Sequence, residues 1–584
     1  MKRKKTSFKL LLFLMGITLM LTISIPLQAA AKCGSPDCDE NCKSKCRMQK
    51  LKSEVQILNE KIEKLEKNSS WAQEDIGDLS NRLDAAEMHT ATDKVSFGVY
   101  FRTQAHSIHY ENTMVAPQSF MGGFFIPYNP ANPLQGGFNG ATLSQIQQGL
   151  QYYAMNNLIP PVESYDTDND IIYTNKFRLD MKAKVNENLS FAGRLAAYKV
   201  FGDSTELKFN QGSLGDVTFD GTSSSLPRGD TIHLERAYFV YKDEYKNVPM
   251  NLSIGRRPST DGPPLEYGNY SEVGGSPLAT IINWQFDGAS LGFGLENITH
   301  IPGFSFKLCY GIGFESDWGN SYSNTPHNDL SDVHLFGFIS DFYDNGKTNL
   351  MFNYAHAWDI TDGFTGTTVM PMIVSKIDQD NDGTPEYYFE PNTGGFVSRI
   401  QPMTNIGDWD AASLLLRTNL SNVLADIDFF LAGSMSHTSP SQISNIPFYE
   451  MMGMGLLNSN GELKSRDGYS IYTGILFPMP LKARLGLEYN WGSEYWFNFT
   501  GAEDSLIGSK LAVRGDVYEA YYIQPIVKRN FFVKVGTQYY DYEYTGSGNP
   551  LGAPVKISEV TSLDALNPVV DKVWNYYASV TFNF

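Results

Sequence analysis

The sequence predicts an all-β protein: a transmembrane antiparallel β-barrel of about 16 strands, preceded by an N-terminal coiled-coil helix. Three observations carry this prediction. The final segment, 573–584, alternates apolar and polar residues and ends on the apolar face at Phe584. Alternating segments of strand length recur along 94–584, with alternately short and long connections. A mean hydropathy of −0.28 with 13% aromatic residues suits a chain in which every second strand residue meets lipid.

Residues 1–31 have the pattern of a secretory signal peptide. Lys2 to Lys5 form a basic end, 10–25 form an apolar core, and Ala29 to Ala31 offer a small-residue cleavage site. The apolar core is shorter than the ~20 residues that a spanning helix needs. We therefore expect an exported protein that inserts into a membrane only through strands.

A cysteine-rich segment, 32–46, follows the signal peptide. Disulfides are the expected state of cysteines in an exported protein, but four thiols also suit a tetrahedral metal site. Disulfides between chains, at the head of a coiled coil, are a third possibility. The lone Cys309, in a predicted strand, is expected to be packing only. The cysteines of the segment are Cys33, Cys38, Cys42 and Cys46.

Residues 47–90 carry a heptad repeat and are predicted to form a periplasmic coiled coil. One core position holds Val55, Ile62, Ser69, Ile76 and Leu83, and the other holds Leu51, Leu58, Leu65, Ala72, Leu79 and Ala86. A single helix cannot bury such a seam, so we expect a homo-oligomer. The residue types lean toward two helices, whereas analogy with barrel porins favours a trimer. The alternative is that the helix packs on the mouth of the barrel.

The outer-membrane barrel is expected to span 94–584. Asp287-Gly288 is interpreted as a bulge within one long strand, because a turn there would give an odd number of strands. The predicted strands are 95–106, 173–186, 189–201, 231–242, 250–257, 279–296, 304–314, 333–342, 348–358, 409–420, 425–436, 468–477, 481–491, 513–525, 531–542 and 573–584.

Four motifs within the barrel region resemble a known family. They are Gly255 to Pro264, Gly492 to Thr500, Lys510 to Pro525, and Tyr542 to Gly548. They resemble a domain-of-unknown-function family of outer-membrane porin-like proteins, in which a signal peptide and a coiled coil precede the barrel. The resemblance spans most of 90–584 and implies no catalytic residue. The cysteine-rich segment is not associated with that family.

The expected function is that of a porin that lets small hydrophilic solutes diffuse passively, with a leaning toward anions. In general diffusion porins the loop after the fifth strand folds into the lumen and faces basic residues on the wall. The corresponding loop here is 258–278, and opposed rows of charge across an aperture select solutes by size and polarity. The alternative is a solvated outer loop. The candidate pore residues are Asp261, Glu266 and Glu272 on the loop, with Arg178, Lys182, Lys184, Arg194, Arg257, Lys482 and Arg484 on the wall.

A second candidate site lies in the segment DQDNDGTPE. Its alternating carboxylates, with Gly383 in the sixth position, resemble a calcium-binding loop. A solvated acidic loop is the alternative. The candidate Ca²⁺ ligands are Asp378, Asp380, Asp382 and Glu386.

Other function classes find little support. The sequence contains no H-E-x-x-H, G-x-S-x-G, P-loop or dinucleotide-binding motif, so no enzyme is predicted. The net charge of −18 argues against nucleic acid as a partner. Two rival functions remain open. One is the barrel sleeve of an outer-membrane electron-transfer conduit, which predicts co-purification with a haem protein. The other is a structural or adhesive surface protein with a plugged lumen, which predicts no conductance.

Overall fold

The computed structural model describes two units of the chain, Met1–Asp93 and Lys94–Phe584, which are treated separately. The signal peptide, the cysteine-rich segment and most of the heptad repeat lie outside the described residues. The described residues are 47–48, 50–63, 95–133, 135–202, 232–314, 330–362, 366–369, 372–393, 397–400, 402–422, 424–455, 457–460, 462–501, 505–548 and 552–584.

In the first unit, residues 50–63 form an α-helix. The heptad residues Leu51, Val55, Leu58 and Ile62 are each about half exposed, between 48% and 57%. The single chain therefore leaves the apolar seam of this helix in solvent. None of the helices among the described residues has the length and apolar character to cross a membrane.

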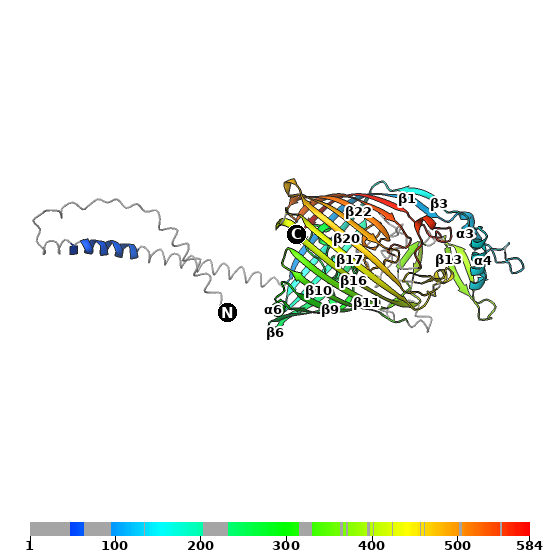
Figure 1. Ribbon diagram of the computed structural model, residues 1–584, viewed down its shortest axis with the longest axis horizontal. Helices are drawn as coiled ribbons and strands as arrows, with labels where there is room; N and C mark the ends of the chain where they lie inside the picture. The colour runs from blue at the N-terminus through cyan, green and yellow to red at the C-terminus, as the bar shows by residue number, and fades with distance from the viewer. Residues whose placement is uncertain are drawn as a thin grey trace, which may run out of the picture. The chain divides into compact units, whose positions relative to one another are not determined.

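The second unit is a closed antiparallel β-barrel, as the alternation of the sequence predicts. From β4 (Ile172–Lys184) onward, each barrel strand pairs with the next barrel strand along the chain. β1 (Val95–Val115) pairs with β4 on one side and with β24 (Lys572–Asn583) on the other, which closes the sheet. The sheet contains 17 strands, but β3 and β4 both lie along β1 and occupy one place in the ring, which gives 16 positions. Figure 1 shows the strands inclined to the barrel axis.

The strands of the barrel are β1 Val95–Val115, β3 Glu163–Asp168, β4 Ile172–Lys184, β5 Leu189–Val200, β6 His233–Tyr245, β7 Val248–Arg256, β8 Asp287–Gly294, β9 Ser305–Phe314, β10 Val333–Asp344, β11 Thr348–Thr361, β16 Asn405–Asn419, β17 Asp428–Pro440, β20 Arg466–Pro478, β21 Arg484–Gly492, β22 Gly515–Val527, β23 Phe531–Tyr542 and β24 Lys572–Asn583.

The predicted strands differ from the structure in two places. β1 continues beyond the predicted end at 106 to Val115, and it pairs there with β3, where no strand was predicted. The segment 279–296 was expected to be a single strand with a bulge at Asp287-Gly288, but β8 begins at Asp287. Residues 279–286 belong to the preceding loop, and they alternate only weakly because they are buried on all sides inside the barrel. Ile281 is 0% exposed and Trp284 is 7% exposed. The count of strands is unaffected.

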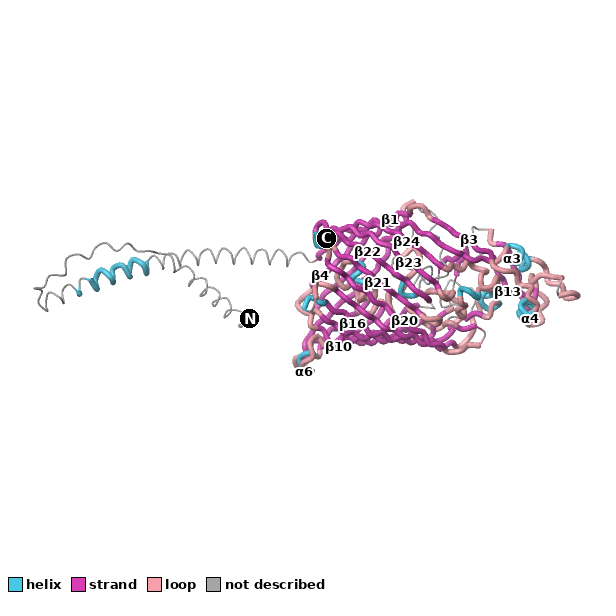
Figure 2. The backbone as a smooth tube through the Cα atoms, turned by 45° about the horizontal axis from the view of Figure 1, so that its top comes forward, coloured by secondary structure: helices cyan, strands magenta, loops and turns pink. Residues whose placement is uncertain are grey.

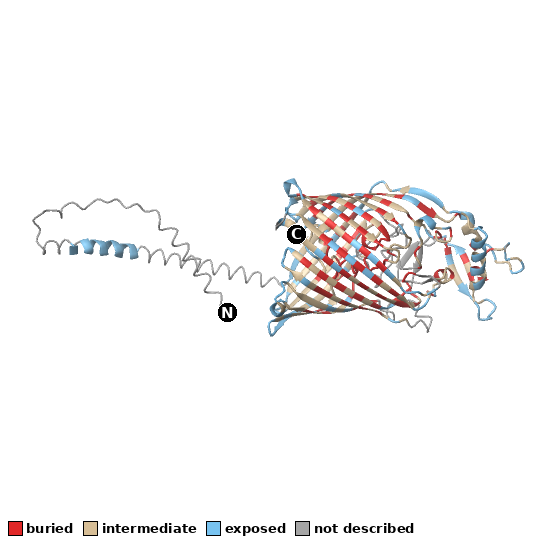
Figure 3. Ribbon diagram, in the orientation of Figure 1, coloured by how far each residue is buried: buried red, intermediate tan, exposed pale blue. Residues whose placement is uncertain are grey.

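The two faces of the strands separate as the sequence predicts. On β24 the inward residues Asn575 and Ser579 are 4% and 5% exposed, whereas the outward residues Tyr576 and Val580 are 49% and 37% exposed. Figure 3 shows this alternation as bands of different burial along the strands. The barrel thus has an apolar exterior and a largely polar inner wall, the reverse of a water-soluble sandwich.

The two ends of the barrel differ. The C-terminus, the tight turns and α6 (Glu296–Thr299) lie at one end, which we call the turn end; α3 (Gln118–Phe125), α4 (Leu143–Met155) and β13 (Met372–Ile377) lie at the other, the loop end (Figures 1 and 2). At the loop end, Phe124, Tyr387, Phe448 and Leu566 belong to one apolar cluster. Four separate loops therefore fold together there. The remaining elements are β2 Ala141–Thr142, β12 Gly366–Val369, β14 Glu386–Pro391, β15 Val397–Ile400, β18 Met454–Gly455, β19 Ser459–Asn460, α5 Leu265–Asn269, α8 Pro447–Met451, η2 Leu420–Asn422, η3 Pro480–Lys482, η4 Lys510–Ala512 and η5 Ile557–Glu559.

Candidate functional site

The loop between β7 and β8, residues 257–286, enters the lumen. Leu278 and Ala279 are completely buried. The Leu278 amide donates to Asn353 on β11 at 3.1 Å, and Thr280 shares a hydrogen bond with Ser413 on β16 at 2.8 Å. The second half of this loop is therefore fastened to one side of the inner wall.

The first half of the same loop contacts the wall at two places, β16 and β23. Glu266 on α5 pairs with Arg417 of β16 at 2.5 Å. Lys534 of β23 donates to the carbonyl of Gly268 at 2.9 Å. The Tyr270 ring meets Phe532 of β23 edge to face, with centroids 5.1 Å apart. The loop therefore bridges the barrel and leaves space beside β1, β23 and β24.

Asp261 of this loop is the centre of an ion cluster. Its Oδ2 lies 2.8 Å from Arg178, 3.3 Å from Arg194 and 3.5 Å from Arg236. Burial alone would raise the pKa of Asp261, but Arg178 and the neighbouring cations hold that pKa well below its usual range. Asp261 therefore stays ionised, and it neutralises part of the basic wall.

The wall side of the cluster depends on a local irregularity of β6. The pairing of β5 with β6 shifts between Arg194 and Leu195, so that Glu235 and Arg236 are both buried although they are adjacent in sequence. Glu235 lies 3.3 Å from Arg178 and 3.2 Å from Arg194. Regular alternation would turn only one of these two side chains inward, and the bulge lets both the carboxylate and the guanidinium face the lumen.

The described residues of the loop between β21 and β22, 493–501 and 505–514, also fold inward, which was not predicted from the sequence. The Phe499 amide donates to Ile281 at 3.0 Å, and the Asn283 amide donates back to Phe499 at 2.6 Å. The Asn498 side chain donates to Thr280 at 2.8 Å. The two inward loops are thus joined to each other. The signal was the aromatic run 496–499, which is unusual for an outer loop.

A buried ionic network fastens the second loop to the wall. Lys510 bridges Glu488 of β21 at 2.5 Å and Glu519 of β22 at 2.6 Å. Tyr472 and Tyr521 donate to Glu488 at 2.6 and 2.7 Å, and Tyr577 donates to Glu519 at 2.6 Å. Each carboxylate is fully partnered, as burial of a charge requires.

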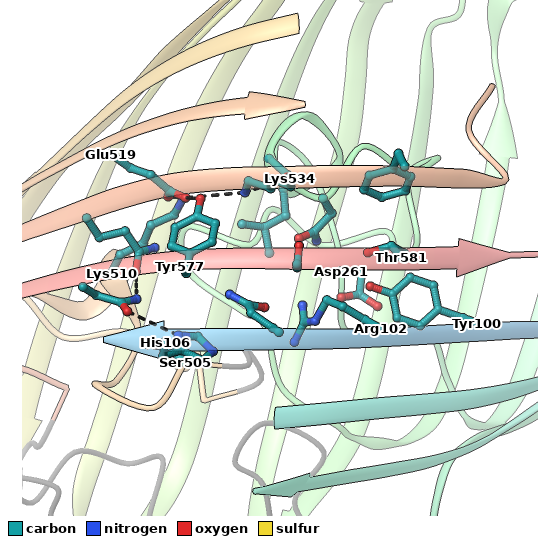
Figure 4. A pocket seen from close by; sticks show the side chains of 18 of the residues that line it. Tyr100, Arg102, His106, Asp261, Ser505, Lys510, Glu519, Lys534, Tyr577 and Thr581 are labelled. Atoms are coloured by element: carbon teal, nitrogen blue, oxygen red, sulfur yellow. Dashed lines mark hydrogen bonds and ion pairs between the residues drawn. The ribbon is translucent and has the colours of Figure 1, made fainter. Parts of the chain in front are cut away.

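Two adjoining cavities remain beside the loops. The larger, about 600 Å³, opens at the turn end, where Asn530 and Phe584 belong to its lining. The smaller, about 110 Å³, lies against β1, β23 and β24. Both are lined by Tyr100, Arg102 and Asp261, so they lie next to each other. Figure 4 shows the smaller cavity, with Arg102 and His106 on β1.

The charges around these cavities are unequal. Eight basic side chains line them, against four acidic ones, although the net charge of the chain is −18. The basic residues are Arg102, Arg178, Lys182, Arg194, Arg236, Lys510, Arg529 and Lys534; the acidic residues are Asp180, Asp261, Glu272 and Glu519.

The structure brings together half of the pore residues proposed from the sequence. Those in the lining of the cavities are Arg178, Lys182, Arg194, Asp261 and Glu272. The others lie elsewhere. Glu266 faces Arg417, and Arg257 donates to Ala289 and to the Cys309 sulfur. Arg484 pairs with Asp426 in the turn after β16 at 2.5 Å. Lys184 and Lys482 are exposed at the turn end. The role of any of them in permeation stays a prediction.

The sequence analysis missed several lining residues. Arg102, Arg236, Lys510 and Lys534 are single basic residues in strands or loops, and nothing in their immediate sequence distinguishes them from residues on a wet wall. They line the cavities only because the two inward loops fill the rest of the lumen.

The predicted Ca²⁺ ligands lie in the turn between β13 and β14. Asp378, Asp380 and Asp382 bring carboxylate oxygens within 4.8 Å of one another. The Gly383 amide donates to Asp378 at 2.9 Å, which curls the turn around the carboxylates. Glu386 is outside this group and accepts from the Gln379 amide at 3.1 Å. Calcium binding at these aspartates stays a prediction.

Comparisons with known proteins give a family for the chain and several solved structures to which it is similar. Residues 166–584 match the family model described as "Protein of unknown function (DUF3373)". No curated protein matches the chain. Among solved structures, the chain is similar to OprB of Pseudomonas putida, at 10% identity and a TM-score of 0.39, covering 86% of this chain and 97% of that one. It is also similar to OmpF of Salmonella typhi in complex with daunomycin, at 10% identity and 0.38, covering 84% and 99%. A third is the outer membrane channel DcaP of Acinetobacter baumannii, at 9% identity and 0.36, covering 84% and 97%.

Proposed function

Because the chain belongs to the DUF3373 family of proteins of unknown function, we infer its function from the residues that line its own lumen. We propose that it is an outer-membrane porin for small hydrophilic solutes, with a preference for anions. The observation that carries the proposal is the excess of basic side chains around the lumenal cavities. In a narrow passage with low-dielectric walls, such an excess raises the local concentration of anions.

The exterior of the barrel supports insertion in a bacterial outer membrane. Outward positions carry large apolar side chains such as Phe101, Leu487 and Phe582, which are 42%, 43% and 41% exposed. Outward aromatic rings follow one another across neighbouring strands; the centroids of Tyr539 and Trp574 are 4.4 Å apart. Aromatic belts at the edge of an apolar band are typical of outer-membrane barrels. With tight turns in the periplasm, the coiled coil would also be periplasmic.

The half-exposed heptad residues of 50–63 support assembly of several copies. We propose a homotrimer, with a dimer as the alternative. Replacing Leu58 by Asp would place a charge in the seam, so the variant should migrate as a monomer in mild detergent at a protein concentration where the wild type is oligomeric. Glu63→Gln, at an exposed position of the same helix, is the control. An unchanged oligomer would mean that the barrels alone hold the assembly together.

Reconstitution into planar bilayers tests the proposal. We expect discrete conductance steps. In a KCl gradient, we expect the reversal potential to be shifted from zero toward the equilibrium potential of chloride. A reversal potential on the potassium side would contradict the anion preference but not the channel.

A second candidate, the surface protein with a plugged lumen, is favoured by the burial of the two inward loops. It predicts membrane insertion without conductance steps. The same recording therefore separates the two functions.

A further inference from the structure

The smaller cavity ends, toward the loop end, at a layer of apolar side chains. On the wall these are Ile108 of β1 and Val573 of β24, which are 1% and 0% exposed. From the inward loop 493–514 come Leu506 and Ile507, which are 8% and 7% exposed. All four belong to one buried cluster. We call this cluster the apolar layer; it also contains Tyr110, Val513, Val517, Tyr540, Tyr542 and Val570.

The apolar layer follows directly on the polar lining of the cavity. His106 and Asn575 line the cavity and share a hydrogen bond of 3.3 Å. The next inward residue on β1 is Ile108, and the next on β24 toward the loop end is Val573. An ion that moves along this wall from the turn end therefore passes from amides and imidazole to purely apolar side chains within one step of the strand pleat.

The loop side of the layer is short and lies between fastened segments. On one side, Phe499 is hydrogen-bonded to Ile281 and Asn283 of the other inward loop. On the other side, Lys510 is held by Glu488 and Glu519. Leu506 and Ile507 thus lie between two attached points of the loop.

From this geometry we infer that Leu506 and Ile507 are a hydrophobic gate, which closes the passage against Ile108 and Val573. The inference rests on the proposed channel function, and it adds that the channel is gated and not permanently open. An apolar constriction excludes water and ions, and wetting or displacement of its side chains restores the path. Arg102, Lys534 and the other charges below the gate would then act on solutes only after the gate has opened.

The test is single-channel recording of the variants Leu506→Ser and Ile507→Thr, alone and together, beside the full-length wild type. A polar side chain in the layer admits water, so we expect the fraction of time spent open to rise about tenfold, the scale set by exposing one buried apolar side chain. Ile108→Ser changes the same layer from the wall side and should act alike. Leu566→Ser is the matched control, because Leu566 is buried in the loop-end cluster and not in the lumen.

The folding of each variant is checked first by heat-modifiable migration on gels. If Leu506→Ser does not fold, the milder Ile507→Thr variant is used for the recording. Equal open fractions in wild type and in the variants of the layer would overturn the gate and leave the channel intact. A rise of the same size in Leu566→Ser would also overturn it, because any loosened loop would then suffice. No conductance in any folded variant would overturn the channel and the gate together.

Discussion

Asp261 shows how one side chain adjusts the field inside the lumen. It is the loop carboxylate that three wall arginines share, at 2.8 to 3.5 Å. Charges at such separations interact strongly where water is scarce. The position of this carboxylate therefore limits how positive the passage becomes.

Replacing Asp261 by Asn should strengthen the preference for anions. Arg178, Arg194 and Arg236 would lose their shared partner, so the ratio of chloride to potassium permeability should rise roughly threefold or more. The measurement is the reversal potential in a KCl gradient. The control is Asp426→Asn, which removes an exposed carboxylate that pairs with Arg484 in a turn. An unchanged ratio in Asp261→Asn would show that permeant ions do not sense this cluster.

We expect the stability of the loop end to depend on pH because of Asp362. Its side chain is fully buried and accepts from Ser444 at 2.7 Å and from the Met403 amide at 2.8 Å. Burial raises the pKa of Asp362 despite these hydrogen bonds. A carboxyl whose pKa is higher in the folded state binds its proton more tightly there. Its ionisation therefore costs stability, from the ordinary pKa of about 4 up through the raised value.

We therefore expect Asp362→Asn to make the loop end more resistant to proteolysis at pH 8, by several-fold in lifetime, with the difference shrinking as the pH falls. Ser444→Ala is the control; it removes a hydrogen bond but keeps the carboxyl, and should shorten the lifetime at pH 8. A variant less resistant than wild type at pH 8 would show that the hydrogen bonds outweigh the cost of burial.

Among elements, the loop 493–514 has the most consequence for the lumen, and Lys510 is its main ionic attachment. Replacing Lys510 by Met would leave Glu488 and Glu519 facing each other without that ammonium group. The loss of one partner of a buried ion pair costs about 3–5 kcal/mol. We expect the loop to undock, so that trypsin or chymotrypsin cuts within 493–514 and single-channel currents become noisy. Lys556→Met, at an exposed lysine of another long loop, is the control. A protected loop in Lys510→Met would assign its docking to the aromatic contacts and to the hydrogen bonds with the other inward loop.

At the scale of elements, the sequence predicted the strands well and the inward loops poorly. Strand positions follow from alternation, because one face meets lipid and the other the lumen. Alternation cannot tell whether apolar residues face lipid or the inside of a filled barrel, so Ile281 and Trp284 looked like part of a strand. For the same reason the run 496–499 was left in an outer loop.

The candidate site was predicted only in part because its residues come from distant segments. Loop 258–278 could be proposed from its place after the fifth strand, and Arg178 and Arg194 from the polar face of their strands. Arg236 was not predicted, since the bulge in β6 turns Glu235 and Arg236 inward together and breaks the alternation at that point. Arg484 was predicted as a pore residue because it lies on the polar face of its strand. It is the first residue of β21, however, and pairs with Asp426 in a turn, away from the inward loops.

The whole molecule depends on an exterior that suits hydrocarbon and an interior that suits water. Ser579 and Val580 are neighbours on β24 and lie on its inward and outward faces, so substitutions at these two positions compare the interior with the exterior. Val580→Lys places a charge on the outward face near the middle of its apolar run and should lower the free energy of unfolding in the bilayer by about 2–4 kcal/mol. Ser579→Asp places a charge on the inward face, in the lining of the smaller cavity and directly opposite Lys534. It should leave the free energy of unfolding within about 1 kcal/mol of the wild type while changing conductance.

The measurement is denaturant titration of protein refolded into lipid vesicles, followed by tryptophan fluorescence. Equal losses in both variants would contradict the assignment of the two faces.

The pairing of β1 with β24 has a consequence for biogenesis. The two strands come from opposite ends of the barrel segment, so the ring cannot be completed before the final residues have been synthesised and exported. Until then, two long rows of unpaired amide and carbonyl groups remain exposed, and such edges readily pair with other polypeptides. A chain on its way to the proposed outer-membrane location would therefore need its edges shielded, and the sheet is complete only when the two ends meet.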